Sequence, residues 1–209
     1  MRLAIAFLGI AVLASTVLAD LTTDPAYVDP SSVVWQGTKA FDYAPFIHST
    51  VDYCVYAPGT FPYGSYTLDS GASYTPAANE FVYAYQLHNL TSSVSLTLLS
   101  VKMLDSNKAN NIGYLSVAGL VPSASEFDAA APNRLVANWY YDGAGLTSGQ
   151  STYYLIYSSV NVPLWNVGTI QNHGDSATND LPSPANFIPE PATLTILALG
   201  LLGLGRKRS

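Results

Sequence analysis

A strict alternation of aromatic and smaller residues at Phe81–Leu87 constrains the fold of this chain most strongly. Phe81, Tyr83, Tyr85 and Leu87 occupy every second position of this segment. In an extended strand, all four side chains therefore lie on one face, whereas a helix would scatter them around its circumference. The segment predicts a half-buried β-strand whose aromatic face packs into a core.

Other segments repeat this period of two at short spacing. Leu135–Tyr141 alternates in the same way, and Thr152–Ser158 places Tyr153, Leu155 and Tyr157 on one face. The face with Tyr153, Leu155 and Tyr157 is expected to be buried, as is the aromatic face of Phe81–Leu87. Weaker strands are expected at five further segments: Val33–Gln36, Val51–Tyr56, Ser65–Leu68, Gly113–Val117 and Leu164–Ile170.

Short polar segments are expected to connect these strands. Asn89–Ser93 is interpreted as the turn that makes Val94–Val101 the hairpin partner of Phe81–Leu87, and Asp142–Gly145 as a second hairpin turn. Ser123–Ala131 is the one internal segment expected to form a short helix, with Ser125 as the candidate cap. Further turns are expected at Pro58-Gly59, Pro62–Gly64, Ser70-Gly71, Asn110-Asn111 and Gly174-Asp175.

Strands at this spacing, without long helices between them, favour antiparallel sheets packed face to face. We therefore expect an all-β protein with an antiparallel β-sandwich, jelly-roll-like or immunoglobulin-like, in a single domain at residues 20–180. The following stretch, residues 181–188, contains Pro and Ser and is expected to be an extended tether.

The N-terminus is typical of a cleaved signal peptide. Arg2 supplies one positive charge, Leu3–Leu13 is apolar, and Ala19 is the small residue expected at the cleavage site. Cleavage after Ala19 would remove residues 1–19 and start the mature chain at Asp20. An uncleaved N-terminal anchor is the alternative, and a lipid anchor is excluded because the residue directly after the cleavage site is Asp20 and not a cysteine.

The C-terminus begins with a rigid signal and continues into an apolar segment. Pro189 and Pro191 fix φ and lack an N–H group, so the chain around Glu190 is extended and stays outside the following helix. Ala192–Gly205 carries no charge and is interpreted as a single transmembrane helix. At 1.5 Å per residue this segment rises about 21 Å, against roughly 30 Å of hydrocarbon, so it is a short span.

Three cations, Arg206, Lys207 and Arg208, follow this helix and are expected to snorkel to the membrane surface. They should remain cytoplasmic, which leaves everything before Pro189 on the outer side of the membrane. A buried C-terminal helix of a soluble domain is the alternative. It leaves the terminal cations and the flanking prolines unexplained.

With these three parts in this order, the chain resembles the PEP-CTERM class of exported bacterial proteins. The resemblance rests on residues 189–209 alone. It implies processing by an exosortase-type membrane transpeptidase, with Pro189, Glu190 and Pro191 as the recognition signal rather than as catalytic groups. It also implies export to the cell envelope, cell surface or extracellular matrix, with the tail as a membrane anchor before processing.

The segment between the two ends is acidic. It holds thirteen acids but only four cations, a formal charge of −9. A domain with this balance lacks the basic surface that nucleic acid requires, so no nucleic-acid partner is expected. Its single cysteine, Cys54, has no partner for a disulfide in the chain and is expected to be a small buried side chain rather than a reactive thiol.

No local motif indicates a catalytic centre, a metal or a cofactor. His48, His88 and His173 lack metal-ligand spacing, and nothing marks Glu126 and Asp128 as a glycosidase pair. A Gly-x-Ser-x-Gly elbow and a phosphate-binding loop are also absent from the sequence. We therefore expect no cofactor and no enzyme. Sites assembled from distant segments leave no local trace, however, so an unrecognised secreted hydrolase stays as the less favoured alternative.

The fifteen tyrosines allow two interpretations. They fill the core of the sandwich, which the alternation at Phe81–Leu87 favours, or some of them stack on sugar rings at the surface. The expected function is a structural or interaction role at the cell surface or in the matrix, and the alternative is an extracellular polysaccharide-binding module. Clustered surface aromatics lining a shallow groove would favour the module. A pocket that brings two carboxylates, or a histidine and an acid, within reach of each other would favour a hydrolase.

Overall fold

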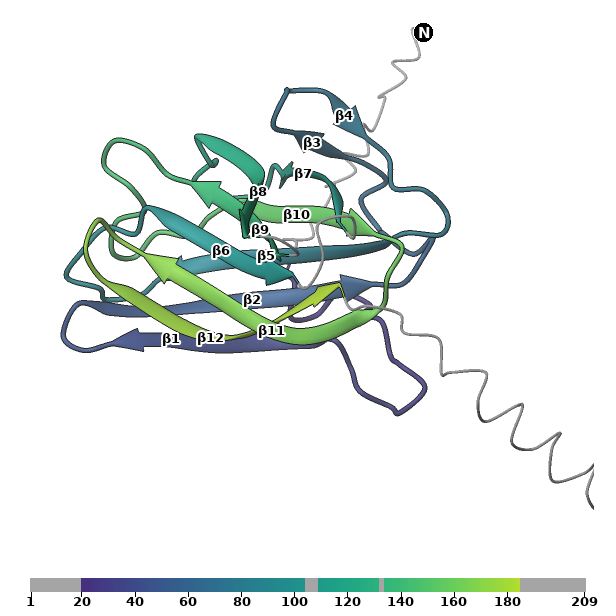
Figure 1. Ribbon diagram of the computed structural model, residues 1–209, viewed down its shortest axis with the longest axis horizontal. Helices are drawn as coiled ribbons and strands as arrows, with labels where there is room; N and C mark the ends of the chain where they lie inside the picture. Colours follow the sequence, from purple (N-terminus) through teal and green to yellow (C-terminus); the bar gives the residue numbers. More distant parts are fainter. Residues whose placement is uncertain (1–19, 104–108, 132–133, 185–209) are drawn as a thin grey trace, which may run out of the picture.

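The computed structural model describes residues 20–103, 109–131 and 134–184, and within these residues it contains strands and no helix. The strands form two antiparallel sheets that face each other (Figure 1). The prediction of an all-β architecture with antiparallel sheets is confirmed.

The larger sheet has seven strands, and its central strand pairs are long. Along the sheet the order is β1 (Gln36–Tyr43), β2 (Ile47–Tyr56), β5 (Phe81–Asn89), β10 (Tyr154–Ser159), β7 (Asn110–Leu115), β3 (Tyr66–Leu68) and β4 (Ser73–Tyr74). The smaller sheet has five strands in the order β12 (Ser176–Pro184), β11 (Pro163–Gln171), β6 (Leu98–Met103), β9 (Arg134–Tyr140) and β8 (Ala124–Ala131).

An aromatic layer fills the space between the sheets. Tyr83 and Tyr85 of β5 and Tyr157 of β10 are fully buried, and Trp139 of β9 reaches them from the opposite sheet. The Tyr83 and Tyr157 rings stack with centroids 5.1 Å apart, and the Trp139 ring stacks on Tyr157 at 6.0 Å. The Tyr85 and Tyr157 hydroxyls are 2.7 Å apart, so the polar ends of these rings are satisfied within the core.

The predicted burial of Phe81, Tyr83, Tyr85 and Leu87 is confirmed. On the second predicted face, Leu155 and Tyr157 are buried as expected. Tyr153 is only half-buried, because it precedes β10, which begins at Tyr154.

The opposite face of the large sheet is also covered along part of its length. Val82, Ala84, Cys54 and Tyr56 form a second buried cluster together with Leu21 from the N-terminal segment. This segment is fixed there by polar contacts, because the Asp24 carboxylate accepts hydrogen bonds from the hydroxyls of Tyr56 and Tyr63 at 2.5 and 2.7 Å. Another part of that face carries the polar side chains of Thr38, Asp52, Gln86 and His88.

The helix predicted at Ser123–Ala131 is wrong, since Ala124–Ala131 is strand β8. Pairing with β9 outweighs the weak helical preference of this segment. This pairing is a tertiary contact, so the local sequence does not reveal it. The Phe127 ring then lies edge-on to Tyr157, at a centroid distance of 6.0 Å. Ser125 does not cap a helix, because its N–H donates to the Asp69 carboxylate at 2.6 Å.

The tether predicted from residue 181 is also wrong in its first part. Residues 181–184 complete strand β12, which pairs with β11 over its whole length, and Leu181 is fully buried. Gly168 of β11 permits this packing, because a Cβ atom there would lie 2.5 Å from Leu181 Cδ1. Residues 185–188 lie outside the described residues.

The two segments that were predicted as hairpin turns do not close hairpins, because each connects a strand of one sheet to a strand of the other. Strand β6, which includes the second half of the expected partner Val94–Val101 of β5, belongs to the five-stranded sheet. Asp142–Gly145 follows β9 of that sheet and leads to β10 of the other one, so it does not close a hairpin. Asn110 and Asn111, predicted as a turn, open strand β7.

Candidate functional site

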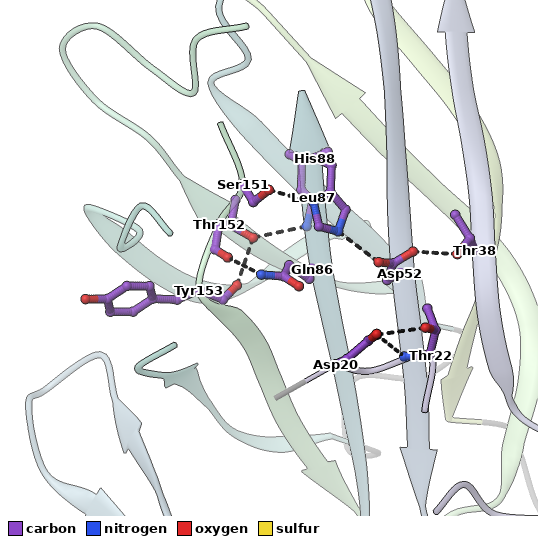
Figure 2. Close-up of polar contacts among 10 residues, drawn as sticks. All are labelled: Asp20, Thr22, Thr38, Asp52, Gln86, Leu87, His88, Ser151, Thr152 and Tyr153. Carbon is purple, nitrogen blue, oxygen red and sulfur yellow. Dashed lines mark hydrogen bonds and ion pairs between the residues drawn. The ribbon is translucent and has the colours of Figure 1, made fainter. Parts of the chain in front are cut away.

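The polar part of the outer face of the large sheet brings together side chains from separate segments of the chain. Thr38 of β1 pairs directly with Asp52 of β2, which pairs with Gln86 of β5. His88 lies two residues further along β5, on the same face, and an isolated bridge places Ser151 opposite it. Figure 2 shows the His88 ring between Ser151 and Asp52.

These residues form a continuous chain of hydrogen bonds. His88 Nε2 lies 2.9 Å from Asp52 Oδ2, and His88 Nδ1 lies 2.6 Å from Ser151 Oγ. The Thr38 hydroxyl donates to the other carboxylate oxygen of Asp52 at 2.5 Å. The Asp52 and His88 side chains are 18% and 23% exposed, so this series of hydrogen bonds is shielded but reachable from solvent.

The charge of Asp52 determines which atoms donate the hydrogen bonds in this series. Burial raises the pKa of the Asp52 carboxyl, but hydrogen bonds from His88 and Thr38 and the charge of protonated His88 lower it by more, so its pKa lies below the ordinary value. The ionised carboxylate only accepts hydrogen bonds, so His88 Nε2 carries a hydrogen. In the neutral imidazole, Nδ1 is then the acceptor, and the Ser151 hydroxyl donates to it.

A cavity of about 300 Å³ adjoins these hydrogen-bonded residues at Ser151. It is lined by Ser151, Gln150, Leu120 and Gly119. Gly119, whose φ is +149°, lies so close to the neighbouring segment that a Cβ atom there would be 2.5 Å from the Thr152 carbonyl. The backbone can therefore approach this closely only at a glycine. The cavity places open space beside Ser151.

A second feature of the molecule is an exposed aromatic pair at the tip of the β1–β2 hairpin. Tyr43 and Phe46 are 45% and 39% exposed, and their rings stack with centroids 6.1 Å apart. Beside them, Asp42 Oδ1 lies 2.5 Å from His48 Nδ1. Flat aromatic surface next to polar groups is the arrangement that stacks on sugar rings.

His173 lies apart from the other two histidines, in a shallow groove that it lines together with Asn172 and Asp175. Within residues 20–103, 109–131 and 134–184, no three His, Cys, Asp or Glu side chains are grouped as a metal site would require. Glu126 accepts a hydrogen bond from the Tyr140 hydroxyl at 2.8 Å.

The interpretation of Cys54 as a buried side chain is confirmed. Its side chain is fully buried, and burial is the main cause that raises the pKa of its thiol to about 12. The thiol is therefore neutral and shielded. Asn89 heads an Asn-Leu-Thr glycosylation sequon, but it is 1% exposed and its amide donates to the Leu146 carbonyl at 2.7 Å, which leaves it inaccessible to a sugar.

The sorting and cleavage residues predicted from the sequence all lie outside the described residues: Ala19, Pro189, Glu190, Pro191, Arg206, Lys207 and Arg208. In the part of the chain that the structure describes, no helix has the length and apolar character needed to cross a membrane.

Comparison with known proteins identifies the C-terminus. The family model for the PEP-CTERM protein-sorting motif matches residues 187–209. No curated protein and no solved structure matches the chain. The resemblance of the tail to the PEP-CTERM class is thereby confirmed, and the motif indicates an exported protein of the cell envelope that is sorted through an exosortase.

Little in the sequence pointed to the site around His88. The alternation at Phe81–Leu87 places Gln86 and His88 on the face opposite the aromatic residues, which is a weak signal for a polar surface. Asp52 and Ser151 are 36 and 63 residues away from His88, and no local pattern connects them.

Proposed function

We propose that this protein is exported and displayed at the cell surface, or deposited in the extracellular matrix, as a structural or interaction domain. The observation that carries the proposal is the sorting motif at residues 187–209. The last strand of the sandwich ends at Pro184, so the folded domain and the motif lie within a few residues of each other. Such a protein presents its sandwich directly at the surface where its tail is handled, and this role requires no reaction of the domain.

The proposal is tested in a host that contains an exosortase, by comparing the full chain with a variant in which Pro189, Glu190 and Pro191 are all alanine. We expect the full chain to leave the cytoplasm and to lose mass at its C-terminus. The triple variant should be exported but remain unprocessed in the membrane fraction. A full chain that stays soluble in the cytoplasm, or a mature mass that does not depend on the motif, would contradict the proposal.

A second candidate function is binding of extracellular polysaccharide, and the exposed pair Tyr43 and Phe46 favours it. Stacking of a sugar ring on an aromatic side chain needs no cationic surface, which suits an acidic domain. The exported protein is tested for retention on immobilised matrix polysaccharide. Tyr43→Ala should weaken retention, whereas Val160→Ala, at another exposed apolar position, should not. Equal retention of both variants would remove this candidate.

A further inference from the structure

We propose that Ser151, His88 and Asp52 form a hydrolytic site in which Ser151 is the nucleophile towards carboxylic esters with a small acyl group. This inference goes beyond the proposed display function. It also departs from the expectation of a domain without catalysis, which rested on the absence of a local motif.

The geometry meets the requirements of an activated nucleophile. A nucleophile and its base must lie within about 2.6–3.2 Å of each other, and a third group must orient the base. Ser151 Oγ to His88 Nδ1 is 2.6 Å, and His88 Nε2 to Asp52 Oδ2 is 2.9 Å. The ionised Asp52 fixes the tautomer in which the free ring nitrogen accepts the serine proton.

The backbone holds these groups in register. The Asn89 N–H donates to the Gln150 carbonyl at 2.9 Å, and the Thr152 N–H donates to the Leu87 carbonyl at 2.9 Å. These two bonds flank the bridge between His88 and Ser151 on both sides. The Gln86 side chain adds a third contact by donating to the Thr152 carbonyl at 2.9 Å. A site supported by strands and bonded neighbours keeps its geometry better than one on a free loop.

The cavity beside Ser151 offers space for an acyl group, and the exposed side chain of Gln150 in its lining is the candidate donor to the charge that develops there. Gln150 lines the cavity, and its side-chain oxygen accepts a hydrogen bond from the Thr147 N–H at 2.8 Å. With the oxygen fixed in this way, the amide NH₂ is the end of Gln150 that remains to donate. Side-chain amides of this kind stabilise the oxyanion of acyl-transfer reactions. A volume of about 300 Å³ suits a small acyl group better than a long chain.

The reaction follows from these positions. Ser151 Oγ attacks the ester carbonyl carbon and forms a C–O bond while His88 Nδ1 takes the hydroxyl proton. The C–O bond to the alcohol then breaks, and the alcohol leaves with the proton that His88 returns. Water attacks the acyl-serine with His88 again as base, which releases the carboxylic acid and restores Ser151. Ester and water give acid and alcohol, with no other reactant.

A purely structural hydrogen-bond chain is the competing explanation, and the molecule contains a useful comparison. The Asp42–His48 pair lies on the same sheet but is 54–57% exposed, and among the described residues no hydroxyl group bonds to the other ring nitrogen of His48. His48 therefore has the acid partner without the nucleophile or the shielding. The His88 pair, by contrast, combines an acid, a hydroxyl group and an adjoining cavity.

The test uses the exported, purified full chain with a fluorophosphonate probe, followed by peptide mapping, and p-nitrophenyl acetate as substrate. We expect a single label on Ser151, and none in Ser151→Ala. His88→Gln should slow labelling and turnover by about a hundredfold or more, the contribution typical of a general base. The matched control His48→Gln should leave both rates unchanged.

Thermal melting of each variant separates loss of chemistry from loss of folding. Gln150→Glu is a second variant that keeps an oxygen for the Thr147 N–H but replaces the amide donors with a negative charge. It should slow turnover at an unchanged melting temperature. A folded wild-type protein that neither labels nor turns over overturns the proposal, and so does labelling at another serine or turnover that persists in Ser151→Ala.

Discussion

Tyr83 lies at the centre of the aromatic layer that joins the two sheets. Its ring is fully buried and stacks on Tyr157, and its hydroxyl donates to the Asn161 carbonyl at 2.8 Å. At the other extreme, Tyr43 exposes 45% of its surface at a hairpin tip. Residues of one type therefore serve two purposes in this domain, and their position on the sheet decides which one.

Truncation of Tyr83 should therefore be costly. Tyr83→Ala removes a large buried ring and leaves a cavity, so we expect a loss of about 3–5 kcal/mol in the free energy of unfolding. Tyr43→Ala is the control and should change it by less than about 0.5 kcal/mol. Chemical denaturation of the exported protein measures both. A small loss for Tyr83→Ala would place the ring at the surface and contradict the packing.

Asp52 should make stability depend on pH in the acid range. Because its pKa is lowered in the folded protein, its contribution is fully present above the ordinary aspartate pKa of about 3.9 and is lost as the pH falls through the lowered value. Asp52→Asn should therefore lower the melting temperature at about pH 6 and approach the wild type at about pH 2. A difference that is the same at both pH values would contradict this assignment.

At the scale of elements, strand β12 decides where the folded domain ends. It is the edge strand of the five-stranded sheet and pairs with β11, and Leu181 packs over Gly168 and near Phe41. The Pro and Ser content of residues 181–184 is typical of a linker. An edge strand tolerates these residues, since proline there costs no hydrogen bond that a second neighbour would need.

Truncation of Leu181 distinguishes a strand from a tether. In β12, Leu181→Ala should cost about 2–5 kcal/mol, as expected for a fully buried leucine. In an extended tether the same change would have almost no effect. Leu164→Ala, at a position of β11 that is 44% exposed, is the control. Equal melting temperatures for the two variants would argue for the tether.

At the scale of the whole molecule, an acidic two-sheet domain is joined closely to a sorting motif. Strands that are distant in sequence contact each other in this domain, such as β1 and β12. A protein that is exported before it folds must form these contacts outside the cytoplasm. Both sheets are complete before the motif begins at residue 187.

The secondary structure of the whole domain can be checked in solution. Residues 20–188, secreted without the tail, should give a far-UV circular dichroism spectrum of β type with little helix. The described residues contain no helix, and the segment predicted as one is strand β8. Substantial helix content in this protein would contradict both the architecture and the correction at β8.

Strands with a clear period of two were predictable from the sequence, because side-chain alternation is a local property. Phe81–Leu87 became β5, and Leu164–Ile170 lies within β11. Residues 37–43 of β1 and the whole of β12 were missed, since their burial depends on neighbours far along the chain. Val82 and Ala84 also follow no pattern that reveals their burial, because the N-terminal segment covers them.

By itself, the sequence determined the all-β class, the aromatic face of β5 and the sorting motif at residues 187–209, because each depends on residues that are adjacent or alternate along the chain. Only the tertiary structure decided which strands share a sheet, that β8 is a strand and that residues 181–184 are part of the fold. The tertiary structure also brings Asp52, His88 and Ser151 into contact. Pairing between distant strands creates that site, and such pairing leaves no mark on the local sequence.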